Sequence, residues 1–301
     1  METKSLTESA FDYDVVVVGG GPAGCSAGVF TARYGLDTAV FDRGNSSLKR
    51  CAHLENYLGF PAGIDVETFY ELMHDHAETA GCELVADHVE SVDRTEADEG
   101  FVVAPQEGEP VTARRVIAAT RYDGEYLRGL DTDAAMFETR DHDGEAQEHF
   151  DRTYAASDGT TPVDGLYVAS PSEEADRQVI VAAGRGARVG LQVIEDGRRD
   201  WGYPEAVVDH YDWLRSDAEL DGEWGDRDRW REWIDDQFPD DHDLDEERRT
   251  AIRERLIDRR FDTYLSTDEI TRRREQGQKE LLEHVDDDLI VAAAREIEAE
   301  Q

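Results

Sequence analysis

The stretch YDVVVVGGGPAGCSAGVFTARYGLDTAVFDRG, residues 13–44, carries the clearest structural signal in the chain. Val15–Val18 is a continuous β-branched run, which is typical of a strand buried on both faces. The glycines that follow predict a tight turn and then a helix to about Tyr34, and Thr38–Phe41 predicts a second strand. These elements form a β-α-β unit, so we expect an α/β fold built on a parallel sheet.

The glycine spacing points to a nucleotide. Gly19, Gly21 and Gly24 match G-x-G-x-x-G, directly after the strand and at the start of the helix. In such a loop the first glycine permits the turn, the second lets the backbone approach a pyrophosphate, and the third allows close helix–strand packing. The helix N-terminus adds free N–H groups and a positive dipole. Asp42 ends the second strand, 18 residues after Gly24, where an acid holds the adenosine ribose. A glycine-rich turn without a ligand is the alternative.

Further elements follow along the chain. An apolar stripe over Val66–Ala80 predicts a helix that ends at Gly81. The pieces CELVA, VESV, FVVAP and PVTARRVIAAT predict strands, the middle ones forming a small antiparallel meander and the last returning to the main sheet. Residues 121–164 are polar and glycine-rich, so we expect mostly loop. GLYVAS (165–170) predicts another buried strand, followed by a helix lined with small residues.

The composition changes near residue 200. The segment beyond it is acidic and helical in pattern, with Trp230, Trp233, Ile234 and Phe238 on one helix face. That face is either a docking surface or the core of its own domain. Ser266 and Glu269 form a capping box ahead of a later helix. We therefore expect a nucleotide-binding domain over 1–200 and an acidic α-helical region over 201–301.

The charge of the chain is extreme. It has 71 acidic residues against 32 basic ones, of which only three are lysines, and a formal net charge of -39. Self-repulsion of this size weakens a compact state in dilute buffer, whereas molar salt shortens the Debye length to ~3 Å. Because the acids are spread along the chain, the pattern resembles proteins of salt-accumulating halophilic archaea rather than one acidic tail. It argues against nucleic acid or an anionic membrane as a partner.

Several motifs together resemble one family. GGGPAG is similar to the FAD site of low-molecular-weight thioredoxin reductases, within the FAD-dependent pyridine nucleotide-disulfide oxidoreductase superfamily. LENYLGFPAGID (54–65), RRVIAAT (114–120) and GLYVASPSEEADRQVIVAAGRG (165–186) resemble three further segments of that family. The resemblance covers residues 12–197. It implies a Rossmann-like FAD-binding domain and a flavoprotein oxidoreductase.

The same resemblance assigns residues to the cofactor. Asn56 would lie near the flavin, and the helix that opens at Arg177 would point its positive dipole at the isoalloxazine ring, favouring the negative charge of a reduced flavin. The implied cofactor-binding residues are Gly19, Gly20, Gly21, Pro22, Ala23, Gly24, Asp42, Arg43, Asn56, Val89, Ala119, Thr120, Arg177, Gln178 and Val179.

The chain also departs from the family pattern. The family inserts an NADPH-binding domain, with a second glycine motif and a CxxC dithiol, between the segments that correspond to 114–120 and 165–186. Here the interval 121–164 has neither motif, and a full nucleotide-binding domain needs about 100 residues. Ser170-Pro171 replaces the family's Gly-Asp, Arg121 replaces a glycine, and NSSLKRC (45–51) replaces Gly-Gly-Gln-Leu. We therefore expect no NADPH domain and no disulfide exchange.

Cysteines and histidines give weaker hypotheses. Cys51 is the one cysteine that we consider a catalytic candidate, as a charge-transfer thiolate or a mixed-disulfide site, although a plain packed thiol is the favoured interpretation. Cys25 and Cys82 fit core positions. His74 and His76 are two residues apart on a helix, so they face different directions and predict no metal site; His76 fits a core position.

The leading hypothesis is a FAD-dependent oxidoreductase that acts through flavin-mediated hydride or electron transfer. Its electrons would come from or pass to a small molecule or a partner protein, free NAD(P)H included. The first alternative is a degenerate, non-catalytic nucleotide-binding or interaction module of the same fold, and the second is an ordinary NAD-binding Rossmann enzyme. Without a membrane-length apolar run or a signal-peptide core, we expect a cytoplasmic protein, and the resemblance leaves room for a homodimer.

Overall fold

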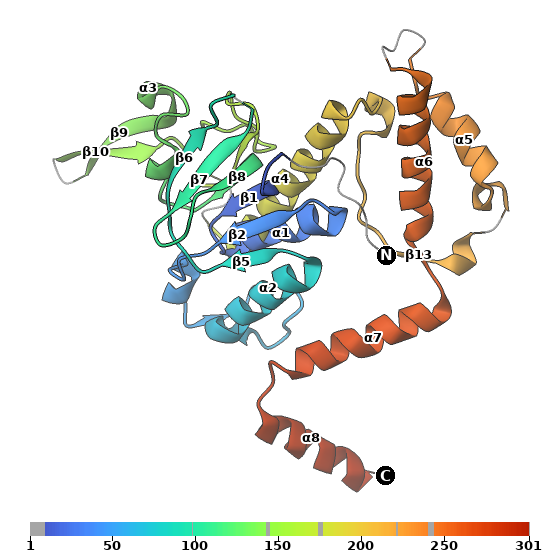
Figure 1. Ribbon diagram of the computed structural model, residues 1–301. Helices are drawn as coiled ribbons and strands as arrows, with labels where there is room; N and C mark the ends of the chain where they lie inside the picture. Colours follow the sequence, from blue (N-terminus) through green and yellow to red (C-terminus); the bar gives the residue numbers. More distant parts are fainter. Residues whose placement is uncertain are drawn as a thin grey trace. The chain divides into compact units, whose positions relative to one another are not determined.

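The valine run is the centre of the structure. In the computed structural model it forms β1 (Tyr13–Val18), which pairs in parallel with β2 (Thr38–Phe41) on one side and β8 (Val111–Ala119) on the other (Figure 1). Val16 and Val18 belong to one apolar cluster, and Val15 and Val17 belong to a second cluster on the opposite face. The strand is thus buried on both faces, as its β-branched sequence predicts.

The structure describes residues 10–97, 99–142, 145–173, 177–220, 222–239 and 244–300. These residues belong to two units, Met1–Gly197 (unit 1) and Arg198–Gln301 (unit 2).

Unit 1 contains a seven-stranded sheet in the order β5-β2-β1-β8-β7-β6, with β11 also pairing with β8. β7 runs antiparallel to the first residues of β8, and β11 runs parallel to the last ones. The α/β fold with a parallel sheet and a small antiparallel meander is therefore confirmed. The further strands of this sheet are β5 (Glu83–Val85), β6 (Val89–Arg94), β7 (Phe101–Pro105) and β11 (Leu166–Ser170).

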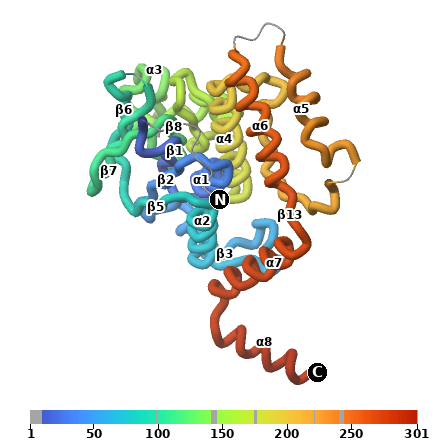
Figure 2. The backbone as a smooth tube through the Cα atoms, turned by 45° about the vertical axis from the view of Figure 1, so that its right-hand side comes forward, coloured from blue at the N-terminus to red at the C-terminus, as the bar shows by residue number. Residues whose placement is uncertain are grey.

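Two helices pack closely on one face of this sheet. They are α1 (Pro22–Tyr34) and α4 (Val179–Asp200), and their residues share a cluster with Val15 and Val17. A Cβ added at Gly186 would lie 1.9 Å from the carbonyl oxygen of Ala23, so only glycine permits this approach of α4 to the start of α1. The tube in Figure 2 shows the two helices side by side.

The helix α2 (Val66–Ala80) has the predicted bounds. Asp65 caps its N-terminus by accepting a hydrogen bond from the Thr68 N–H, and Gly81 ends it at φ +106°. Phe69 and Tyr70 pack under the loop that precedes the helix. The loop holds the 3-10 helix η1 (Ser47–Arg50) and the short strands β3 (His53–Leu54) and β4 (Ile64–Asp65).

The described part of the interval 121–164 is mostly loop, as expected, but it also contains short regular elements that the sequence did not predict. The described part of this interval contains η2 (Glu125–Leu127), α3 (Asp133–Met136) and a hairpin of β9 (Phe137–His142) and β10 (Glu145–Phe150). The segment is anchored by a few separated apolar side chains that join the cluster on the meander side of the sheet: Tyr126, Leu127, Met136, Phe137 and Phe150. Because charged residues lie between these anchors, no periodicity revealed the strands.

Unit 2 is helical, as expected. Trp230, Trp233, Ile234 and Phe238 of the predicted face pack with α6 residues in one apolar cluster, so this face forms the core of its own unit. Ser266 caps α7 by accepting a hydrogen bond from the Glu269 N–H, and no described residue of α7 or α8 is buried. The elements of unit 2 are η3 (Glu205–Val207), β12 (Arg215–Ser216), η4 (Asp217–Glu219), η5 (Gly222–Gly225), α5 (Arg227–Asp235), α6 (Glu246–Asp262), β13 (Tyr264–Leu265), α7 (Thr267–Leu282) and α8 (Asp287–Glu300).

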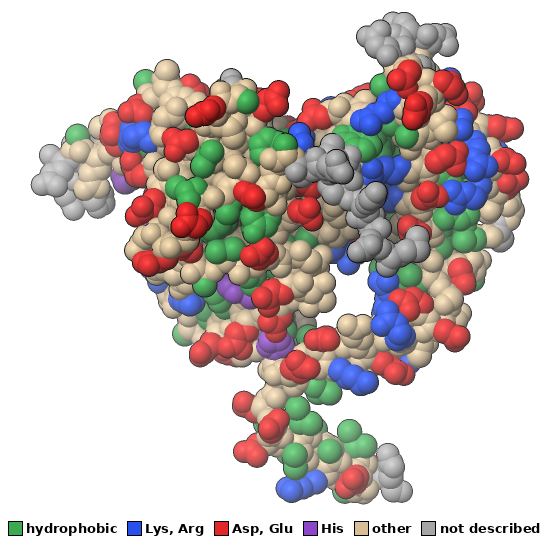
Figure 3. Space-filling view, in the orientation of Figure 1, with side chains coloured by type: hydrophobic (Ala, Val, Ile, Leu, Met, Phe, Trp, Pro, Cys, Tyr) green, Lys and Arg blue, Asp and Glu red, His purple; other side chains and the backbone are tan. Residues whose placement is uncertain are grey.

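The surface reflects the composition. Acidic side chains are spread over both units on the face drawn in Figure 3. Within the part of the chain that the structure describes, no helix is long and apolar enough to cross a membrane.

Candidate functional site

A cavity of about 500 Å³ opens at the carboxyl ends of the central strands. Its walls include the last residues of β1, β2, β8 and β11, namely Val18, Phe41, Ala119 and Ser170. In open α/β sheets ligands bind at this edge, because the loops and helix N-termini that follow the strands meet there. The cavity therefore lies where the fold places a ligand.

The glycine turn forms the floor of this cavity. Gly19 has φ +116°, and an added Cβ would lie 2.4 Å from the carbonyl oxygen of Ala119. A Cβ on Gly24 would lie 1.7 Å from the carbonyl oxygen of Gly19, so this glycine lets α1 begin directly on the turn. At Gly21 the nearest atom to such a Cβ is the Ser46 Oγ, at 3.3 Å. A side chain at Gly21 would therefore occupy space at the cavity wall, which glycine leaves for a ligand.

Two helix N-termini meet at the cavity. Pro22 and Ala23 at the start of α1 line it, and so do Val179 and Ala182 at the start of α4. The cap of α1 has no side-chain hydrogen bond. Both helices exceed twelve residues, so each presents N–H groups and a positive dipole end to the cavity.

Most of the residues that the sequence assigned to a cofactor come together here. The lining includes Gly19, Gly20, Gly21, Pro22, Ala23, Asp42, Arg43, Val89, Ala119, Thr120, Arg177, Gln178 and Val179. It also includes Cys51, the catalytic candidate. Gly24 packs behind the turn instead. Asn56 also lies outside the lining, but its Nδ2 donates a hydrogen bond of 2.9 Å to Oε1 of Gln178, which is part of it.

Asp42 is held by groups that sequence reasoning did not find. The Tyr70 hydroxyl donates a hydrogen bond to Oδ2 of Asp42, and Nε2 of His74 lies 3.4 Å from the same oxygen. Burial, followed by this hydrogen bond, raises the pKa of Tyr70. His74 also contacts the Gly20 carbonyl oxygen at 3.0 Å, so one face of α2 supports both the turn and the carboxylate. The i, i+4 spacing of Tyr70 and His74 was the available signal.

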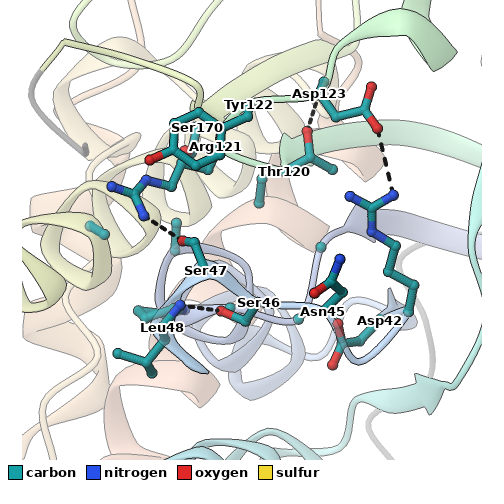
Figure 4. A pocket seen from close by; sticks show the side chains of 18 of the residues that line it. Asp42, Asn45, Ser46, Ser47, Leu48, Thr120, Arg121, Tyr122, Asp123 and Ser170 are labelled. Carbon is teal, nitrogen blue, oxygen red and sulfur yellow. Dashed lines mark hydrogen bonds and ion pairs between the residues drawn. The ribbon is translucent and has the colours of Figure 1, made fainter. Parts of the chain in front are cut away.

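A contact of Arg121 with Ser47 and Tyr122 at the cavity was also not predicted from the sequence. Nη1 of Arg121 donates a hydrogen bond to the Ser47 Oγ, and the guanidinium carbon lies 4.5 Å from the centre of the Tyr122 ring. All three residues line the cavity (Figure 4). Arg121 has φ +66°, and it is the one non-glycine residue with a positive φ among those described.

The charge of the cavity differs from that of the chain. Five basic side chains line it, Arg43, Lys49, Arg50, Arg121 and Arg177, against the three carboxylates of Asp42, Asp87 and Asp123. Arg43 lies 3.7 Å from Asp123 across the opening. In a chain with a net charge of -39, this local excess of cations favours an anionic ligand.

The cysteines differ in exposure. Cys51 is exposed at the cavity, so the interpretation of it as a packed thiol was wrong. Cys25 and Cys82 are buried, as predicted, and burial raises the pKa of each thiol to about 12. Burial therefore disfavours the thiolate form of both cysteines near neutral pH.

The prediction for the histidine pair was also partly wrong. His76 is exposed, and His74 is the one that turns toward the glycine loop. The two side chains do face different directions. Throughout the described ranges, no group of three or more His, Cys, Asp or Glu side chains could hold a metal ion.

The fold and the glycine-floored cavity together define a nucleotide-binding α/β protein, and comparison with known proteins gives its family. Residues 13–190, more than half of the chain, match the model of the pyridine nucleotide-disulphide oxidoreductase family. The chain belongs to this family. Its members are FAD-dependent oxidoreductases, so FAD is the cofactor that membership assigns.

Curated relatives match the same part of the chain. The bifunctional thioredoxin reductase/thioredoxin of Mycobacterium leprae is 36% identical over 129 residues, which cover 41% of this chain and 28% of that protein. The thioredoxin reductase of Rickettsia conorii is 31% identical over 115 residues, which cover 38% of this chain and 36% of the relative. The matches thus span about a third of these relatives.

A solved structure supports the fold. The thioredoxin reductase from Gloeobacter violaceus superposes with a TM-score of 0.50 at 19% sequence identity, covering 68% of this chain and 98% of that one. At this identity the likeness concerns the fold alone. It agrees with a Rossmann-like sheet of the kind seen in unit 1.

Proposed function

We propose that unit 1 binds FAD in this cavity and that the protein is a flavin-dependent oxidoreductase. One observation carries the proposal: a glycine turn, two helix N-termini and a basic lining converge on a single cavity at the carboxyl edge of the sheet. A diphosphate is the anion that such a turn and helix start accept. Family membership supplies the identity of the dinucleotide.

The residues present fit the cofactor. The N–H groups of Gly21 and Ala23 would hold the diphosphate, and Asp42 would hold the adenosine ribose. At the flavin end of the cofactor, Asn56 fixes the Gln178 side chain by a hydrogen bond. The N-terminus of α4 would stabilise negative charge on the isoalloxazine ring. When bound, FAD supplies the redox chemistry of its isoalloxazine ring.

We further propose that the chain works without a nicotinamide domain of its own in the interval 121–164. The described part of this interval forms two short helices and a hairpin, and its sequence has neither a second glycine motif nor a CxxC pair. Electrons would therefore be exchanged with a diffusible small molecule, free NAD(P)H included, or with a partner protein. Cys51 is the cysteine at the cavity that a redox role could use.

One observation favours the non-catalytic alternative. Asp42 already accepts hydrogen bonds from Tyr70 and from the Gly44 N–H, at 3.1 Å for the latter. A ribose would have to share or displace these partners. A module that keeps the fold without turnover would tolerate such occupation of the carboxylate.

The visible absorption spectrum of the full chain, purified in molar KCl and recorded before and after anaerobic NADH or NADPH, tests the proposal. We expect a flavin spectrum in the wild type and no flavin in Gly21→Ala, because a methyl group at this position intrudes on the cavity. Bleaching by NAD(P)H would identify the free nicotinamide as a donor, whereas a persistent spectrum would point to another donor. Colourless protein whose melting temperature does not rise with added FAD would overturn the proposal and support the non-catalytic alternative.

A further inference from the structure

Arg121 keeps an unfavourable backbone conformation at the cavity. Its φ of +66° lies in the left-handed region, which disfavours a residue with a Cβ relative to glycine. A glycine would fit this backbone better. Residues in such a conformation cluster at ligand-binding and active sites, where the surrounding structure holds them.

The side chain is oriented toward the cavity by two neighbours. The Ser47 Oγ accepts a hydrogen bond from Nη1, and the guanidinium stacks near the Tyr122 ring (Figure 4). Both neighbours line the same cavity. A guanidinium that is stacked on a ring and bonded at one edge has lost much of its rotational freedom, which lowers the entropic cost of binding an anion.

The segment that orients Arg121 also touches the phosphate-binding turn. Ser46, the residue before Ser47, has its Oγ 3.3 Å from the position of a Cβ on Gly21. The Ala119 and Thr120 backbone, which leads directly into Arg121, lies against Gly19. The guanidinium and the N-terminus of α1 therefore line the same cavity, and their backbones are in contact through these neighbours. Ser47 and Arg121 also fall at two of the places where the chain departs from the family pattern, and they contact each other.

We propose that Arg121 binds the diphosphate of the dinucleotide together with the N–H groups at the start of α1, and that Ser47 is a positioning residue for it. The inference rests on the proposed function, because it takes FAD as the ligand, and it adds a residue of this chain's own. Arginine suits the role, since its planar fork matches phosphate oxygens in a bidentate manner.

Calorimetric titration of the full chain with FAD and with ADP, at one fixed molar salt concentration, tests the proposal. We expect Arg121→Gly to weaken both ligands by the same factor, about 10- to 100-fold, because both carry the diphosphate. Arg121→Lys should lose less affinity for both ligands, since lysine keeps the positive charge but cannot bind two phosphate oxygens with one planar group. Ser47→Ala should weaken the affinity for both ligands about threefold. Arg140→Ala makes the same charge change on the hairpin and should leave both affinities unchanged.

The glycine variant is suited to this test because its backbone prefers a positive φ. Its melting temperature should equal or exceed that of the wild type, so weaker binding cannot be attributed to unfolding. Unchanged ADP affinity in Arg121→Gly would overturn the proposal, and so would a loss for FAD alone, which would place the contact on the flavin half. If the wild type binds ADP but not FAD, the proposed function fails while the comparison with ADP still decides the role of Arg121. A wild type that binds neither ligand would refute both.

Discussion

The two units use arginine differently. In unit 2, Arg231 makes two hydrogen bonds of 2.9 Å to Glu254, and Arg249 and Arg253 pair with Asp235 at 3.0 and 2.8 Å. In unit 1, five basic side chains gather around one cavity. Basic residues are scarce in this chain, and carboxylates are abundant everywhere. The gathering of basic side chains around one cavity therefore indicates that the ligand is an anion. The arginines of unit 2 stabilise a small helical core.

The largest expected effect separates folding from binding within unit 1. Gly24→Ala places a methyl group against the Gly19 carbonyl, at 1.7 Å before relaxation, and should destabilise unit 1 by about 3 kcal/mol or more. Gly21→Ala meets only the Ser46 Oγ within 4 Å, so its stability should change by less than ~1 kcal/mol while FAD binding is lost. Thermal unfolding followed by circular dichroism, with FAD titration of each variant, measures both. Equal stabilities of the two variants would contradict the assigned roles.

The next effect concerns the ion pairs of unit 2. Hydrogen bonds from Arg231, and then from Arg253, lower the pKa of Glu254 to about 2, from 4.5 as its ordinary value. Because the pKa is lower in the folded state, the stabilisation is fully present above pH 4.5 and is lost as the pH falls toward 2. Allowing for partial exposure, we expect Glu254→Gln to cost about 1 kcal/mol at neutral pH.

Urea unfolding of wild type and Glu254→Gln, at neutral pH and at about pH 3, checks this expectation. The difference between the two proteins should shrink at the lower pH, since the wild-type carboxylate then begins to lose its advantage. Glu232→Gln is the matched control, because Glu232 is 74% exposed and pairs only weakly with Arg229 at 3.6 Å. A difference that stays constant with pH would show that Glu254 acts through packing and not through its charge.

The smallest effect has opposite signs for folding and binding. Raising KCl from about 0.2 M to molar concentration should raise the melting temperature by a few degrees, because salt screens the repulsion among the surplus carboxylates. The same change should weaken FAD binding by about twofold to fivefold, since it screens the attraction between the basic lining and the phosphates. Differential scanning calorimetry and titration at several KCl concentrations measure the two. Tighter FAD binding at high salt would argue that the cavity does not attract its ligand by charge.

The elements predicted correctly have local signals. A run of four valines gives β1, the glycine spacing gives the turn and the start of α1, and Gly81 ends the apolar stripe of α2. Each of these signals lies within about fifteen residues, and each is dictated by backbone geometry or burial. The location of the candidate site followed from the same elements, because the strand ends bring their loops together.

The features that were missed depend on contacts between distant residues. Tyr70 reaches Asp42 across 28 positions, and Arg121 reaches Ser47 across 74. Apart from Ala146, the strands β9 and β10 have polar or charged residues between Phe137 and Phe150, and only these two phenylalanines at the base of the hairpin show where it attaches to the core. His74 faces the glycine turn, whereas His76 is exposed. The positions of the apolar residues along α2 did not predict which of the two histidines would face the turn.

The base of that hairpin has an evolutionary consequence. Phe137 and Phe150 are register partners with rings 5.7 Å apart, so the chain leaves and re-enters unit 1 at neighbouring points. The sheet therefore imposes no length on whatever lies between them. About a dozen residues connect Phe137 and Phe150 here. A whole domain could be inserted between these two residues, or removed, without disturbing the main sheet of unit 1.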